Sequence, residues 1–141
     1  MNLDLRQLTY ELNGAAIEVH RTLGPGLLES AYESAFCREL FLRGIPFARQ
    51  VPLQLTYKGE TIDCGFRIDV LVDRRVVVEL KAVERTLPIH EAQLLTYLKL
   101  SGHQVGLILN FHVLAMKDGI CRMVNNLTDD SASSAPSAVQ S

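Results

Sequence analysis

The sequence predicts a mixed α/β domain, a sheet flanked by helices. Two helical patterns come first, several apolar runs with strand-like alternation follow, and a further helix separates these runs from a short, continuously apolar strand. A helix between two strands is typical of the crossover that joins parallel strands. The order of the elements therefore predicts a mixed sheet with helices packed against it.

Two helices open the chain. Apolar residues of the first helix recur at helical spacing and stop before Gly24-Pro25-Gly26, where glycine and proline end it. These apolar residues are Leu8, Leu12, Ala15, Ala16, Val19 and Leu23. The second helix is predicted from about Leu28 to Leu42, and it ends at Gly44 before Pro46.

Alternating apolar residues then predict a hairpin. The residues from Val51 to Tyr57 alternate in polarity, Lys58-Gly59 marks a turn, and the next strand begins near Thr61. Because Pro52 has no backbone N–H to donate, the first of these strands is expected at an edge of the sheet.

The following runs carry charged residues among apolar ones. Along the first run the alternation predicts a strand with Asp69 on the face opposite the apolar one. The apolar face holds Phe66, Ile68, Val70 and Val72. The second run has Val76, Val78 and Leu80 on one face and Val77, Glu79 and Lys81 on the other. Asp73-Arg74-Arg75 supplies a polar turn between the two runs.

Three further elements complete the predicted domain. A helix is expected from about Ile89 to Leu100, and Val105–Leu109 is apolar throughout, as in a strand buried on both sides. Asp118-Gly119 predicts the turn of a hairpin between Val113–Met116 and Ile120–Val124.

Composition indicates one globular domain. With 141 residues, of which 48% are hydrophobic, residues 1–124 can form a fair core. Residues 125–141 are rich in Ser, Ala, Asn and Asp and are expected to form a disordered tail. No apolar run of about 18 residues and no secretory signal is present, so we expect no membrane span and a cytoplasmic location. The scattered Cys37, Cys64 and Cys121 argue against both a disulfide framework and a thiolate zinc site.

If the charged runs pair as a hairpin, Asp69 lies beside Glu79 and Lys81. Two carboxylates held close together repel each other unless a divalent cation or a proton lies between them. Their oxygens suit Mg²⁺ or Mn²⁺, which retain waters able to attack phosphorus, and a nearby ammonium can stabilise a developing anion. The three residues therefore predict a hydrolytic metal site. The alternative is a plain ion pair between Glu79 and Lys81 at a strand edge.

The order of Asp69 and then Glu79-Leu80-Lys81 resembles the signature of the PD-(D/E)xK nuclease superfamily. Upstream, the run from Gly26 to Tyr32 matches the pattern that names the GxxExxY protein family, a bacterial and archaeal group assigned to that superfamily. The preceding run from His20 to Gly26 is similar to the same family.

The resemblance extends from about Leu5 to Val124. Gln93 and Tyr97 fit the helix that follows the Glu-x-Lys strand in many such nucleases. One departure concerns the first Asp of the signature, which often follows Pro but here follows Ile68. Because that Pro is a backbone feature and supplies no ligand, its absence affects the bend of the strand more than the chemistry.

The resemblance implies a restriction-endonuclease-like core and a metal-dependent nuclease that hydrolyses phosphodiester bonds of DNA or RNA. It implies that Asp69 and Glu79 bind Mg²⁺ or Mn²⁺ and that Lys81 supports the attacking water or the transition state. It also implies catalytic roles for Glu29, at the metal site or in positioning water, and for Gln93, as a donor to a phosphate or to the lysine. The alternatives are that Glu29 only compensates the helix dipole and that Gln93 is a structural amide.

The charge balance leaves another function open. Fourteen basic and 16 acidic residues give a net charge of −2, whereas a strong non-specific duplex binder usually carries a basic excess. Phosphate contacts are therefore expected from a local patch of Arg67, Arg74, Arg75, Lys81 and Lys99, with ordinary solubilising charge as the alternative for Arg74 and Arg75. The alternative function is a non-catalytic nucleic-acid-binding or protein-interaction module on a nuclease fold.

Many enzymes with this fold act as dimers, and the first helix is a candidate homodimer interface. The alternative is that its apolar stripe covers the sheet.

Overall fold

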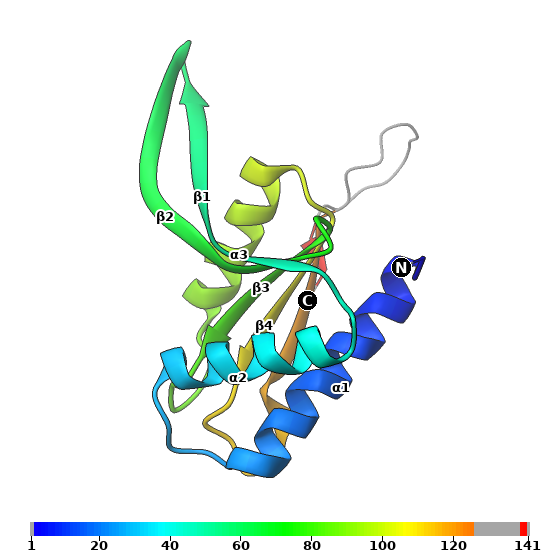
Figure 1. Cartoon of the computed structure of the whole chain (residues 1–141). Coiled ribbons are helices and arrows are strands. Elements are labelled where there is room, and N and C mark those ends of the chain that lie inside the picture. Colours follow the sequence, from blue (N-terminus) through cyan, green and yellow to red (C-terminus); the bar gives the residue numbers. More distant parts are fainter. Residues whose placement is uncertain (1, 126–138, 141) are drawn as a thin grey trace.

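The computed structural model describes residues 2–125 and 139–140, and it confirms the predicted α/β fold (Figure 1). Helices α1 (Leu5–Leu23) and α2 (Glu29–Leu42) precede strands β1 (Phe47–Tyr57), β2 (Glu60–Val72) and β3 (Val76–Lys81). They are followed by α3 (Pro88–Ser101), β4 (Val105–Asn110), the 3-10 helix η1 (Met116–Gly119), β5 (Ile120–Asn125) and β6 (Val139–Gln140). No described helix is long and apolar enough to cross a membrane.

The described strands form one mixed sheet in the order β1-β2-β3-β4-β5-β6. Strands β3 and β4 are parallel, whereas the other neighbouring strands are antiparallel. Helix α3 is therefore the crossover between two parallel strands, as predicted. Strand β1 lies at an edge, where the missing N–H of Pro52 is tolerated. The β1–β2 hairpin extends well beyond the rest of the sheet (Figure 1).

Helices cover both faces of the sheet (Figure 1). On one face α1 and α2 pack around a core that includes Val78 and Leu107. On the other face α3 contributes Leu94, which packs with Val77 and Ile108. Consecutive residues of β3 and of β4 thus enter opposite cores, which explains the unbroken apolar runs Val76–Val78 and Val105–Leu109.

Strand β2 changes face at Asp69, and the predicted single apolar face is therefore wrong. Val70 packs on the α1–α2 side of the sheet, whereas Ile68 packs on the α3 side. The regular β1–β2 pairs skip Gln50 and Asp69, which lie opposite each other, and Gln50 has a φ of 54°. A local irregularity of this kind changes the face of the sheet to which the following side chains of a strand point.

The hairpin predicted around Asp118-Gly119 is wrong in its first strand. Residues Met116–Gly119 form the 3-10 helix η1, and β5 pairs with β4 instead. Met116 is buried in the core, and a Cβ on Gly119 would lie 2.0 Å from the carbonyl oxygen of Asn110. Burial of the methionine and this close backbone approach favour a compact turn over an extended strand.

Most of the predicted tail lies outside the described residues. Within the range 125–141, Asn125 ends β5 and is buried, and Val139–Gln140 is a strand that pairs with Val124 and Asn125. These two residues are strand rather than tail because the edge of β5 offers backbone groups for pairing.

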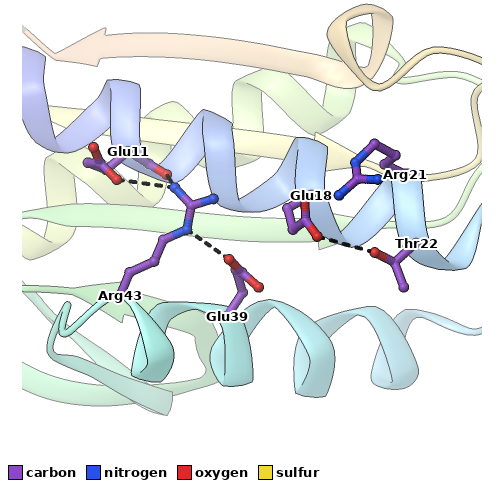
Figure 2. Close-up of polar contacts among 6 residues, drawn as sticks. All are labelled: Glu11, Glu18, Arg21, Thr22, Glu39 and Arg43. Atoms are coloured by element: carbon purple, nitrogen blue, oxygen red, sulfur yellow. Dashed lines mark hydrogen bonds and ion pairs between the residues drawn. The ribbon is translucent and has the colours of Figure 1, made fainter.

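A partly exposed ionic network joins α1 to α2 (Figure 2). Arg43 follows α2, and its guanidinium donates from Nε to Glu39 at 2.9 Å and from Nη1 to Glu11 of α1 at 3.1 Å. Arg21 and Glu18 pair within α1 at 2.6 Å, and the Arg21 side chain is 71% exposed. Arg43 therefore connects the two helices, whereas Arg21 stays within one.

We expect Arg43→Met to lower the free energy of unfolding by roughly 1 kcal/mol, because two partly buried ion pairs are lost, one with Glu11 of α1 and one with Glu39 of α2. Arg21→Met should change it by less than about half of that, since its pair is exposed and local. Urea unfolding of both variants measures the difference. Equal destabilisation by the two substitutions would contradict the assignment of Arg43 as the connection between the helices.

Candidate active site

Asp69 and Glu79 lie side by side on β2 and β3. Regular pairing of the two strands ends at Val70 and Val78, and beyond this point side chains replace the backbone partners. The N–H of Leu80 donates to Asp69 Oδ2 at 2.9 Å, and the N–H of Asp69 donates to Glu79 Oε2 at 3.2 Å. Each carboxylate therefore binds the strand that carries the other.

Burial and repulsion raise the pKa of both carboxyl groups. Glu79 is 4% exposed, and burial followed by the charge of Asp69 raises the pKa of Glu79 from 4.5 to about 8. Burial also raises the pKa of Asp69, although the hydrogen bond from Leu80 acts in the opposite direction. In the absence of a cation, the pair therefore holds a proton near neutral pH.

Lys81 lies at the end of β3, close to both carboxyl groups. Its charge lowers the pKa of Asp69 and of Glu79, but burial and repulsion outweigh this effect. Among the described residues, no ion pair of 4.0 Å or less joins Lys81 to Glu79. The structure thus brings the three predicted residues together without a direct contact that would neutralise the acids.

Glu29 begins α2 next to the end of β3. Its Oε2 accepts a hydrogen bond from the N–H of Ala82 at 3.4 Å, and its charge contributes to the raised pKa of Asp69. The carboxylate is exposed. The first turn of α2 therefore lies beside the residue that follows Lys81.

The glycine-rich run before α2 is held in place by the side chain of Tyr32. The hydroxyl of Tyr32 donates to the carbonyl of Gly24, and its ring stacks on Phe111 with 4.5 Å between the centroids. These contacts fix the loop that leads into Glu29. His20 is buried, and its Nε2 lies 2.7 Å from the carbonyl oxygen of Val113, so this ring nitrogen contacts the chain after β4 and not the carboxylates.

Gln93 is not joined to the carboxylates by any described contact. It is exposed on α3, and its side chain takes part in no hydrogen bond among the described residues. Tyr97, one turn further along α3, stacks on Phe66 with 3.6 Å between the centroids. Burial raises the pKa of Tyr97, and the charge of Glu79 adds to this effect. Helix α3 therefore reaches the site through Tyr97, and the role of Gln93 stays a prediction.

Sequence reasoning missed Glu33, a buried acid one turn after Glu29 on α2. Glu33 accepts a hydrogen bond from Arg49 Nε at 3.0 Å and two from Gln50 Nε2 at 3.1 and 3.2 Å. Its charge contributes to the raised pKa of Asp69. The spacing of four residues between Glu29 and Glu33 places both on one helix face, and this spacing is the signal that could have revealed it.

The residues present fit a hard divalent cation. Two carboxylates on adjacent strands offer oxygen ligands, and a cation between them would relieve the repulsion that raises their pKa. Among the described residues, no group of three His, Cys, Asp or Glu side chains lies close enough together to bind one metal ion. Proteins often bind Mg²⁺ or Mn²⁺ through one or two carboxylates while water and substrate phosphate fill the other positions, so two carboxylates are enough to hold such an ion.

A family comparison agrees with this arrangement. Residues 6–123 match the profile of the PD-(D/E)XK nuclease superfamily. The chain belongs to this superfamily. Its members generally use divalent metal ions, and membership supports a nuclease with a nucleic-acid substrate. No curated protein and no solved structure matches the chain significantly. The matched range runs from α1 to β5 and contains Asp69, Glu79 and Lys81.

We expect the metal-free protein to lose stability as the pH rises from about 4.5 to about 8. Glu79 binds its proton more tightly in the folded state than in the unfolded chain, so raising the pH through this window favours unfolding. The loss should be on the order of a few kcal/mol and should level off above the folded-state pKa. Urea unfolding in the presence of EDTA across this range measures it.

Glu79→Gln cannot titrate, so it should reduce this pH dependence strongly. Glu84→Gln, which removes an exposed carboxylate beyond β3, serves as the control and should keep the slope of the wild type. An unchanged slope in Glu79→Gln would show that the buried glutamate does not hold the proton.

Proposed function

We propose that this protein is a metal-dependent nuclease that hydrolyses phosphodiester bonds of DNA or RNA, and that it is a member of the GxxExxY family. The observation that carries the proposal is the reciprocal binding of Asp69 and Glu79 across β2 and β3, with Lys81 on the same strand as Glu79. A structural ion pair does not require a buried acid beside a half-buried one, with the pKa of both raised.

Asp69 and Glu79 are the proposed ligands of Mg²⁺ or Mn²⁺. The bound ion supplies Lewis acidity and lowers the pKa of a coordinated water, which is the chemistry that phosphodiester hydrolysis needs. The backbone bonds from Leu80 and Asp69 hold one oxygen of each carboxylate, which orients the side chains before a cation arrives. This orientation limits the reorganisation that accompanies binding.

Lys81, Glu29 and Gln93 are proposed to act on the substrate and the attacking water. The Lys81 ammonium stabilises the negative charge that develops on the phosphate oxygens. The Glu29 carboxylate, beside the end of β3, positions water, and Gln93 donates to a phosphate from α3. Proximity to the carboxylate pair supports Glu29 more directly than Gln93.

Metal binding must displace the proton that the carboxyl pair retains. Since the pKa of Glu79 is about 8, metal affinity should rise with pH up to this value and each bound ion should release protons. Cleavage assays with single- and double-stranded DNA and RNA, in Mg²⁺, Mn²⁺ or EDTA, test the activity directly. Nucleic-acid binding without cleavage under all of these conditions would favour the non-catalytic module instead.

We expect Asp69→Asn to abolish cleavage and to weaken Mg²⁺ binding strongly, because one anionic ligand is replaced by a neutral amide. Nucleic-acid binding without metal should be retained or strengthened, since one repulsive charge near the phosphate is lost. Calorimetric titration of Mg²⁺ and Mn²⁺, together with the cleavage assay, measures both effects. Asp73→Asn, in the turn between β2 and β3, is the control and should leave metal affinity unchanged.

Lys81→Ala should lower the cleavage rate by on the order of 10²-fold or more while Mg²⁺ still binds, because charge stabilisation in the transition state is lost but both ligands remain. Single-turnover rates and calorimetry on the same preparation separate the two effects. A Lys81→Ala variant with the wild-type rate would remove the lysine from the mechanism.

A further inference from the structure

Asn110 ends β4 directly beside Lys81. The two residues are partners in the parallel β3–β4 register, and Asn110 is only 2% exposed. A buried side-chain amide needs partners for both its oxygen and its NH₂ group. The hydrogen-bond partners of the Asn110 side chain therefore show which part of the chain it holds in place.

The side chain of Asn110 binds the segment that follows Lys81. Its Nδ2 donates to the carbonyl of Val83 at 2.9 Å, and its Oδ1 accepts from the N–H of Val83 at 3.1 Å. The same oxygen accepts from the N–H of His112 at 3.2 Å. The amide thus continues the pairing of β3 beyond its last backbone pair, which is formed at Lys81.

Three consecutive residues at the end of β3 are fixed in this way. The carbonyl of Lys81 accepts from the N–H of Phe111 at 2.9 Å, and the N–H of Ala82 donates to Glu29 at 3.4 Å. Val83 is held by the amide through both of its backbone groups. Because a lysine side chain is long and has many rotamers, the position of its ammonium depends on how firmly its backbone is held.

We propose that Asn110 is a positioning residue for Lys81. By holding both backbone groups of Val83, it sets the direction in which the chain leaves β3, and with it the point from which the ammonium reaches Asp69 and Glu79. The catalytic meaning of this role rests on the proposed nuclease function. The placement of Lys81 by Asn110 does not, and it can be measured separately.

Asn125 is a matched control. It is also a buried asparagine at the end of a strand, with 3% exposure, and its Nδ2 donates to the carbonyl of His103 at 3.3 Å. Its strand β5 is separated from β3 by β4. If buried amides at strand ends serve stability alone, Asn110→Ala and Asn125→Ala should have the same effect at Lys81.

The experiment compares these two variants of the full chain under conditions in which both are folded by circular dichroism. The first readout is kcat and KM in Mg²⁺ on a substrate that the wild type cleaves. The second is the ¹³C chemical shift of the Lys81 side chain at one fixed pH after reductive methylation with ¹³C-formaldehyde, which reports the surroundings of its nitrogen. Lys81→Arg assigns its signal, and Lys58, Lys99 and Lys117 serve as references.

Asn110→Ala should lower kcat by about 10- to 100-fold with little change in KM or in Mg²⁺ affinity, since a small displacement of a catalytic group has effects of this size. It should also move the Lys81 NMR signal while the signals of the reference lysines stay unchanged. Asn125→Ala should do neither. If Asn110→Ala does not fold, Asn110→Ser replaces it, because its hydroxyl keeps a polar group without adding a charge but is too short to bind both backbone groups of Val83.

Two results would overturn the inference: an unshifted Lys81 signal in the Asn110 variant, or equal shifts in the Asn110 and Asn125 variants. A wild type that cleaves no nucleic acid would refute the nuclease function, and the Lys81 chemical shift would then decide the placement of the lysine alone. An unshifted Lys81 signal together with reduced kcat would show that Asn110 acts on catalysis by another route, which also overturns the inference.

Discussion

The exchange of hydrogen bonds between Asp69 and Glu79 is the constraint on which the candidate site depends. Beyond the last regular pair of β2 and β3, the Asp69 carboxylate binds the backbone of β3 and the Glu79 carboxylate binds the backbone of β2. Backbone donors offset part of the desolvation of the buried Glu79 and the half-buried Asp69, but they cannot remove the repulsion between the two acids. The strands therefore hold the acids together in an arrangement that favours a proton or a cation.

The irregularity at Asp69 also connects the site to both helix layers. Opposite Asp69, Gln50 leaves the regular ladder and donates to Glu33 of α2, whose charge acts on Asp69. On the other side of the sheet, Tyr97 of α3 lies within the field of Glu79. Because β2 changes face at this position, Glu33 of α2 and Tyr97 of α3 both lie within electrostatic reach of the carboxylate pair.

The proton retained by the carboxyl pair relates stability to the proposed function. A neutral Glu79 suits a buried position, whereas metal binding requires the charged form. Catalytic sites often contain residues that destabilise the folded state when they carry the charge that their function requires. Asn110 and Tyr32 stand in contrast to the acids, because their polar groups are satisfied by backbone partners and fix the loops around the site.

The sequence by itself determined the three long helices, the strands from β1 to β5 and the approach of Asp69 to Glu79 and Lys81, because periodicity and turn residues act over short distances along the chain. Glu29 was assigned to the site from a family resemblance, since no local pattern relates a helix start to a distant strand. Only the tertiary structure decided the face of Ile68, the turn at Met116–Gly119 and the partners of Asn110. The bond from Val83 to Asn110 spans 27 residues, and contacts over such distances exist only once the sheet and its helices have packed.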